Sequence, residues 1–143
     1  MQVNKFHFPL DRKYHKSHLW LKPEENVVTL GIDAFLANKV GYINFLTIEK
    51  KSVKAGEAFA SIESGKYVSR IYSPINGVIL ERNEEVISNP RRINENPYDA
   101  WIVTIQPDVK DGIDSANLLE KEKEINDWIQ EEIKKFEEEE DEE

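Results

Sequence analysis

The chain has 143 residues, a formal net charge of −9 and no cysteine. This length suits one domain around one core, and the lack of cysteine excludes a disulfide framework, a thiolate metal site and a cysteine nucleophile. The acidic balance argues against nucleic-acid binding, because proteins that neutralise phosphates need clustered lysine and arginine. No stretch has the length and apolarity of a signal peptide or a membrane span, so we expect a soluble cytoplasmic protein without a membrane partner.

The N-terminal third of the chain is predicted to be β structure with one short helix. Residues 1–13 form an extended arm, and the strand-forming side chains at 18–21 and 27–32 predict a hairpin. Asp33 is a helix-capping residue type and Gly41 a helix-ending one, so a short helix is predicted between them.

The middle of the chain continues as short strands separated by turns. Five strands are predicted, at residues 43–48, 59–62, 68–72, 78–80 and 101–105. Asn76 and Gly77 are suited to positive φ angles and are predicted to form a turn before the fourth of these strands. Residues 84–98, which contain two Asn-Pro pairs, are predicted to be a long ordered loop. This pattern indicates a mainly β fold, a small barrel or sandwich with α additions.

The hydrophobic period changes from two to about 3.6 residues from Asn117 onward. Apolar side chains then fall on one stripe, which comprises Leu118, Ile125, Trp128, Ile129, Ile133 and Phe136. We therefore predict a C-terminal helical segment over residues 108–136 that docks on the body, with a partner-binding helix as the alternative. Residues 137–143 are expected to form a solvated acidic tail, or else to steer partners by charge.

The sequence shows no constellation of an enzyme active site. His15 and His18 are three residues apart, which is a ligand spacing on a helix but not on a strand, so we expect no metal site and assign the histidines structural or surface roles. No glycine-rich phosphate loop, Ser-His-Asp set or pair of carboxylates in an apolar context is present. The chain is therefore predicted not to be an enzyme.

Lys66 is the remaining candidate for chemistry. The predicted strands at 59–62 and 68–72 flank Ser64 and Gly65, which are turn-forming residues, so the two strands are expected to form a hairpin. Lys66 would then lie at its tip and project into solvent. An exposed turn lysine taken alone indicates only a solubilising charge.

The hairpin around Lys66 has the motif Glu63-Ser64-Gly65-Lys66-Tyr67. This motif resembles the lipoylation hairpin of the H protein family of the glycine cleavage system. Further matches occur in the order and at the spacing of the family. In chain order they are Tyr14 with His18 and Trp20, Gly31-Ile32 with Ala34 and Gly41, Val53-Lys54-Ala55-Gly56-Glu57, the run from Tyr72 to Val78, the run from Ile93 to Tyr98, Trp101 and Ile105-Gln106-Pro107. The resemblance covers about residues 14–107, which we take as a lipoyl-carrier domain.

Membership of this family implies a barrel-sandwich hybrid with lipoate in amide linkage on Lys66. It also implies a lipoate-attaching enzyme that recognises the hairpin through its shape and through Glu63, Ser64 and Gly65. The chain would be a non-catalytic carrier that shuttles an aminomethyl intermediate and reducing equivalents between glycine decarboxylase, aminomethyltransferase and dihydrolipoamide dehydrogenase. A tethered group of this kind raises the effective concentration at each enzyme in turn.

Two residues depart from the family pattern near the expected arm. Leu19 stands where the family usually has Glu, and Arg70 stands where it often has Asp. Together with His18, these residues are predicted to form a docking surface for the arm. If they face it, a cationic cargo is disfavoured by about 1 kcal/mol at a surface dielectric. The alternative is that both changes are neutral drift on a tolerant surface.

The departures motivate a second hypothesis for the cargo. The chain also resembles the H-like lipoate-binding carriers of sulfur oxidation, which would carry sulfur intermediates for a heterodisulfide-reductase-like complex. A third hypothesis, from another class, is an unmodified binding or scaffold protein in which Lys66 stays bare.

Overall fold

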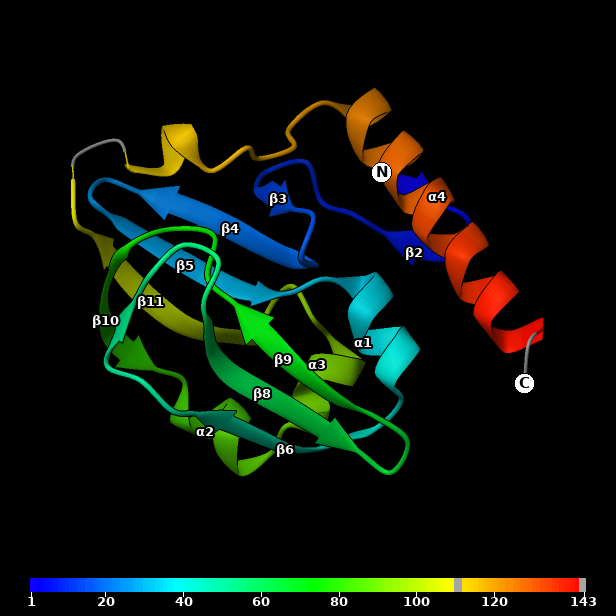
Figure 1. Cartoon of the computed structure of the whole chain (residues 1–143), viewed down its shortest axis with the longest axis horizontal. Helices are drawn as coiled ribbons and strands as arrows, with labels where there is room; N and C mark the ends of the chain where they lie inside the picture. The colour runs from blue at the N-terminus through cyan, green and yellow to red at the C-terminus, as the bar shows by residue number, and fades with distance from the viewer. Residues whose placement is uncertain (110–111, 142–143) are drawn as a thin grey trace.

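In the computed structural model, residues 1–109 and 112–141 are described, and two antiparallel sheets face each other as a barrel-sandwich hybrid (Figure 1). The larger sheet has the strand order β3 (Lys13–His15), β4 (Leu19–Glu24), β5 (Val27–Ile32), β11 (Trp101–Pro107), β10 (Gly77–Arg82) and β7 (Ser52–Val53). The smaller sheet has the order β6 (Ile43–Ile48), β8 (Ala58–Ser64) and β9 (Val68–Tyr72). The predicted mainly β class is confirmed.

The main core lies between the two sheets. Leu21, Leu30 and Ile105 of the larger sheet and Ile43 and Ile62 of the smaller sheet are buried there, each at most 1% exposed. Alternate residues of β8 and β9 point into this core, and the residues between them point outward. The alternation therefore decides which side chains of the smaller sheet remain available to partners.

Helix α1 (Ala34–Val40) forms as predicted. The Asp33 side chain caps it by accepting a hydrogen bond from the Leu36 backbone N–H at 2.9 Å. Gly41 ends it with φ of 79°, a conformation that favours glycine. The helix lies beside the tip of the β8–β9 hairpin (Figure 1).

The predicted long loop over residues 84–98 is wrong, because two short helices occupy most of it. Helix α2 (Glu84–Ser88) is capped by Asn83, and helix α3 (Arg91–Glu95) begins after Pro90. Each helix buries one apolar residue in the main core, Val86 or Ile93. Five-residue helices are not stable alone, so this burial is what holds them.

Gly77 does not form the predicted turn with positive φ. It lies in β10, opposite Pro107, and a β-carbon there would overlap the carbonyl oxygen of Gln106. The glycine is therefore needed for a close approach of two strands.

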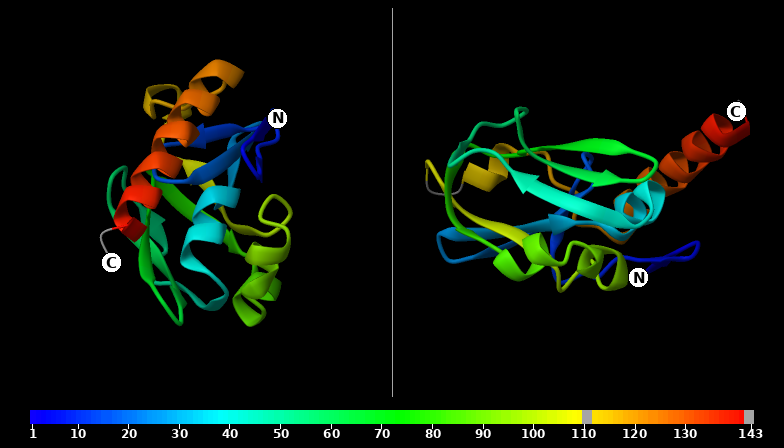
Figure 2. Two further views of the ribbon diagram at one scale, coloured as in Figure 1. Left: turned by 90° about the vertical axis from the view of Figure 1, so that its right-hand side faces the viewer. Right: turned by 90° about the horizontal axis from the view of Figure 1, so that it is seen from below.

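The N-terminal arm is more structured than predicted. Strands β1 (Gln2–Val3) and β2 (Phe6–His7) form a small hairpin that packs in a second apolar cluster with α4 (Glu122–Asp141). Strand β3, which was not predicted, pairs with β4 and places Tyr14 beside Leu119. The N-terminal hairpin and α4 therefore lie side by side (Figure 2).

Helix α4 begins later and ends later than the sequence indicated. The residues before it form a 3-10 turn (Gly112–Ser115) and an extended stretch in which Leu119 exchanges two backbone hydrogen bonds with Tyr14, of 2.7 and 2.9 Å. Leu118 therefore lies outside the helix. The acidic stretch continues the helix as far as Asp141 instead of forming a separate tail, and residues 142–143 lie outside the described part. No helix in the described ranges is long and apolar enough to cross a bilayer.

Candidate functional site

The β8–β9 hairpin places Lys66 at its apex, as predicted from the turn chemistry. Glu63 pairs with Val68, and residues 64–67 form the tip, which is closed by a hydrogen bond from the Ser64 N–H to the Tyr67 carbonyl at 2.9 Å. Lys66 is exposed. The right-hand view of Figure 2 shows this tip beside α1.

Ser64 shapes the tip through its side chain. Its hydroxyl oxygen accepts hydrogen bonds from the backbone N–H groups of Lys66, at 3.1 Å, and Tyr67, at 3.0 Å. Gly65 does not have a positive φ, and a β-carbon at that position would meet no atom within 4 Å. Ser64 therefore has a structural role in the turn, whereas the fold does not require glycine at position 65.

The environment of Lys66 fits an amide-linked group. Its side-chain nitrogen lies 5.7 Å from the centre of the Tyr67 ring, and among the described residues it has no hydrogen bond or ion pair. Tyr67 itself is half-buried against the main core and anchors the tip. Acylation removes the charge of a lysine, and here it would break no ion pair.

The outward face of the smaller sheet presents Glu63 between two exposed apolar residues. Glu63 is paired with Phe45 on one side and Val68 on the other, and these two side chains are 62% and 70% exposed. Arg70, also exposed, follows Val68 on the same face, opposite Ser61. An enzyme that approaches Lys66 from this side would meet this surface.

A cleft of about 380 Å³ opens beside Lys66. Its other walls come from the N-terminal hairpin, α1 and α4, and the residues are Asn4, Lys5, Phe6, Phe35, Asn38, Lys39, Gly41, Ile133, Phe136, Glu137 and Glu140. We call it the Lys66 cleft. Its volume lies in the range of about 300 to 1,000 Å³ that is typical of small-molecule sites. A larger depression of about 730 Å³ lies at α2 and α3 and holds none of the predicted site residues.

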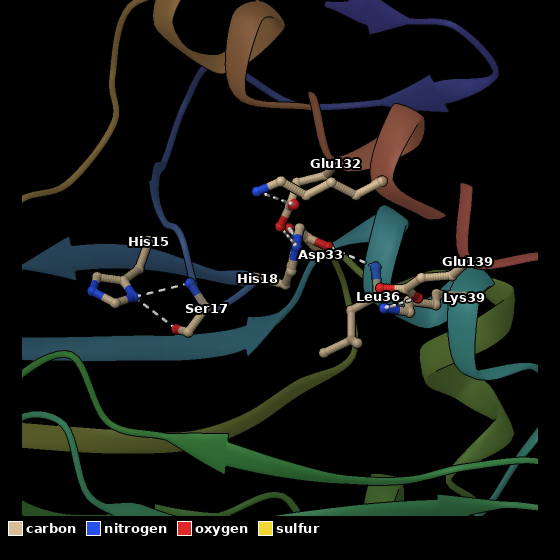
Figure 3. Close-up of polar contacts among 9 residues, drawn as sticks. His15, Ser17, His18, Asp33, Leu36, Lys39, Glu132 and Glu139 are labelled. Carbon is tan, nitrogen blue, oxygen red and sulfur yellow. Dashed lines mark hydrogen bonds and ion pairs between the residues drawn. The ribbon is translucent and has the colours of Figure 1, made fainter. Parts of the chain in front are cut away.

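His18 fixes α4 on the body instead of forming an exposed surface. Its Nδ1 lies 2.8 Å from Asp33 Oδ2, and its Nε2 lies 2.8 Å from Glu132 Oε1 of α4 (Figure 3). The imidazole is stacked between the rings of Phe35 and Trp128, with centroid distances of 4.8 and 4.9 Å.

The two carboxylates keep His18 in its charged form at neutral pH. Burial alone lowers the pKa of His18, but the charge of Asp33 and the hydrogen bonds that His18 donates to Asp33 and Glu132 outweigh burial and raise the pKa to about 9. The hydrogen bond from His18 lowers the pKa of Glu132. Over the described residues, no group of three histidine or acidic side chains has the arrangement of a metal site.

The structure does not bring His18, Leu19 and Arg70 together as one docking surface. The Leu19 side chain is 1% exposed and lies in the main core, so it does not face an arm. His18 lies under α4, and Arg70 lies on the outward face of the smaller sheet. The argument that Leu19 alters the charge met by the cargo is therefore wrong.

The residues of α4 that line the Lys66 cleft were missed as site residues. Ile133, Phe136, Glu137 and Glu140 follow the spacing i, i+3, i+4 and i+7, which places them on one face of the helix. That spacing is visible in the sequence. The approach of these four residues to Lys66 is not visible there, because it depends on how α4 packs on the body.

The sequence model described as "Glycine cleavage H-protein" matches residues 12–132 of the chain. The chain belongs to the glycine cleavage H protein family. A glycine cleavage system H protein of Staphylococcus epidermidis is 43% identical over 101 residues, which are 68% of this chain and 80% of that protein. One from Bacillus velezensis is 38% identical over 117 residues, 80% of this chain and 91% of that protein.

A solved structure shares the fold. The crystal structure of a glycine cleavage system H protein from Mycobacterium marinum superposes with a TM-score of 0.67 and 31% identity, covering 71% of this chain and 87% of that one. The barrel-sandwich fold and the class of lipoyl carrier follow from family membership. Residues 1–11 and 133–143 lie outside the range that the family model matches.

Proposed function

We propose that Lys66 carries lipoate in amide linkage and that the chain delivers the carried group to the enzymes of glycine cleavage. The observation that supports this most directly is an exposed lysine at the apex of a hairpin whose tip is held by Ser64. Its partners would be glycine decarboxylase, aminomethyltransferase and dihydrolipoamide dehydrogenase. The chain would act as a carrier and not as a catalyst.

The hairpin suits a carrier because it combines exposure with rigidity. Lys66 can enter the pocket of another enzyme without unfolding its own domain, since β8 and β9 remain paired up to Glu63 and Val68. Tethering raises the local concentration of the group at each partner. Lipoate would supply the thiol and disulfide couple that a chain without cysteine lacks.

We assign recognition by a lipoate-attaching enzyme to three residues before the lysine. Ser64 sets the direction of the Lys66 backbone through its hydroxyl group. Gly65 leaves open space on that side of the tip, where a larger side chain would obstruct an enzyme. Glu63 offers an exposed carboxylate directly before the tip, three residues before Lys66.

The aminomethyl group of glycine cleavage is the cargo that family membership favours. The sulfur hypothesis depended on Leu19 and Arg70 facing the arm, and Leu19 is buried. Of the two departures, Arg70 alone therefore remains as support for the sulfur hypothesis. An unmodified scaffold role is the other alternative, and the mass measurement described next tests it.

Intact mass after co-expression with a lipoate-attaching enzyme tests the attachment. We expect the mass to increase by one lipoyl group in the wild-type chain and in the control Lys54→Arg, and to remain unchanged in Lys66→Arg. Lys54 is an exposed lysine elsewhere on the surface, so its replacement controls for the general loss of an amine. An unchanged wild-type mass, or a gain that persists in Lys66→Arg, would contradict the proposal.

A further inference from the structure

We propose that Glu137 and Glu140 of α4 make the Lys66 cleft selective for positively charged cargo. The inference rests on the proposed function, because it takes the group on Lys66 to be the occupant of the cleft. Lys66 is itself one of the residues that line the cleft, so a group attached there begins at its edge.

Helix α4 changes character along the face that it turns toward the body. Ile125 and Ile129 are fully buried, and Trp128 is 8% exposed. One to two turns later Ile133 and Phe136 are only half-buried, and Glu137 and Glu140 are exposed. The helix therefore extends beyond the apolar cluster and carries two carboxylates to the cleft beside Lys66.

Apolar rings provide the floor of the cleft. Phe35 contacts Phe6 and Phe136 edge to face, with centroid distances of 5.6 and 6.3 Å. The aliphatic chain and dithiolane of a lipoyl group are apolar, so contact with these rings removes apolar surface from water. The apolar floor therefore suits the lipoyl arm. Glu137 and Glu140 at the rim determine which charge is favoured at the end of the arm.

The charges around the cleft leave the two carboxylates available. Lys39 lies 3.6 Å from Glu139 and packs over the Phe136 ring, so its charge is already paired. Within the described part of the chain neither Glu137 nor Glu140 has an ion-pair partner. Acylation removes the positive charge of Lys66. Of the lysines that line the cleft, Lys5 then remains as a cation that has no ion pair among the described residues.

The two departures from the family pattern do not lie in the cleft, because Leu19 is buried in the main core and Arg70 lies on the outward face of the smaller sheet. Glu137 and Glu140 lie outside residues 12–132, the range that the family model matches. The acidic end of the helix thereby gains a role in cargo specificity instead of acting as a solvated tail.

Charged mimics of a loaded arm test the proposal. The lipoylated full-length chain is reduced, and its thiols are alkylated with 2-bromoethylamine, which adds a cation, or with bromoacetate, which adds an anion; each alkylation releases bromide and a proton. The chain has no cysteine, so the arm is the only source of thiols. Hydrogen exchange by mass spectrometry over residues 133–141 then reports contact of the arm with α4.

We expect the cationic arm to slow exchange there about fivefold more than the anionic arm, which corresponds to about 1 kcal/mol. Glu137→Gln/Glu140→Gln should abolish this difference. Glu131→Gln/Glu138→Gln, which removes the same two charges from the same helix outside the cleft, should retain it. Equal protection by both arms in the wild type, a difference that persists in Glu137→Gln/Glu140→Gln, or its loss in the control would overturn the proposal. Intact mass, measured first, separates these outcomes from a failure of lipoylation.

Discussion

His18 Nε2 lies 2.8 Å from Oε1 of Glu132, so the residue that precedes β4 is joined to a helix 114 residues further along the chain. The same ring contacts Asp33, the cap of α1, through Nδ1. One imidazole therefore holds both helices that wall the Lys66 cleft. The position of α4, and with it the shape of the cleft, depends on the charge of this side chain.

Stability is predicted to decrease as pH rises toward 9. The pKa of His18 is raised from its ordinary value of 6.5 to about 9 in the folded chain, so its stabilising effect is complete below pH 6.5 and is lost as pH rises through 9. We expect the free energy of unfolding to fall by about 2 to 3 kcal/mol over this interval. Urea unfolding at a series of pH values measures this.

The variant His18→Gln should remove the pH dependence in that interval and lower stability at pH 6.5 by about 3 kcal/mol, because Asp33 would stay buried without its cation. His15→Gln is the matched control, since the His15 ring hydrogen-bonds only to Ser17 among the described residues. A wild-type profile as flat as that of His18→Gln would show that His18 is not a charged partner of α4.

The contribution of Glu132 to stability is lost at low pH, whereas that of His18 is lost at high pH. Its pKa is lowered by the hydrogen bond from His18, so its contribution is present above its ordinary value of 4.5 and is lost as pH falls through the lowered value. In Glu132→Gln the decrease in stability between pH 4.5 and pH 3 should be smaller than in the wild type. Lys135→Gln, which removes the neighbouring cation of Glu132 on the same helix, should change this interval less. An acid profile unchanged in Glu132→Gln would argue against the ion pair.

Ser64→Ala should loosen the tip of the hairpin without unfolding the chain. The change removes the acceptor for the N–H groups of Lys66 and Tyr67, which costs about 1 kcal/mol locally. Amide exchange at these two residues should accelerate about fivefold. Ser61→Ala on the same strand is the control, because no hydrogen bond of its hydroxyl is seen among the described residues. Equal exchange at the tip in both variants would contradict the structural role of Ser64.

The two glycines Gly31 and Gly65 should differ in how they tolerate substitution by alanine. A β-carbon at Gly31 would overlap the ring of Trp20, which is itself 2% exposed, so Gly31→Ala should destabilise by about 2 to 3 kcal/mol. A β-carbon at Gly65 meets open space, so Gly65→Ala should stay within about 0.5 kcal/mol of the wild type. Urea unfolding distinguishes them, and equal stabilities would show that the contact between β4 and β5 is wrong.

Docking of α4 is testable through one buried residue. Ile129 is fully buried in the second apolar cluster, so Ile129→Ala should cost about 3 kcal/mol. Gln130→Ala, at the exposed neighbouring position, should change stability by less than about 0.5 kcal/mol. If urea unfolding shows the two variants to be equally stable, α4 does not pack on the body in solution.

The hairpin with Lys66 was predictable because its signals are local. Strand-forming residues on either side of Ser64 and Gly65 determine the turn, and the structure pairs them in that way. The sequence signals that begin and end α1 are local too. The structure confirms both Asp33 and Gly41 in those roles.

The remaining features depend on contacts between residues far apart in the sequence. Helices α2 and α3 are too short to form by propensity and are held by burying Val86 and Ile93. The start of α4 is delayed because Leu119 pairs with Tyr14. The expectation for Leu19 was wrong because a position in a family pattern does not say which way a side chain points; here both Leu19 and its neighbour Trp20 are buried, one in each apolar cluster.

Exchange of the glycine carboxyl carbon with bicarbonate tests the central claim most directly. The lipoylated chain is mixed with its cognate glycine decarboxylase and labelled bicarbonate, and the label entering glycine is measured. The account predicts exchange that requires both the lipoyl group and Lys66, and that is absent with Lys66→Arg. A fully lipoylated wild-type chain that supports no exchange would contradict the assignment to glycine cleavage.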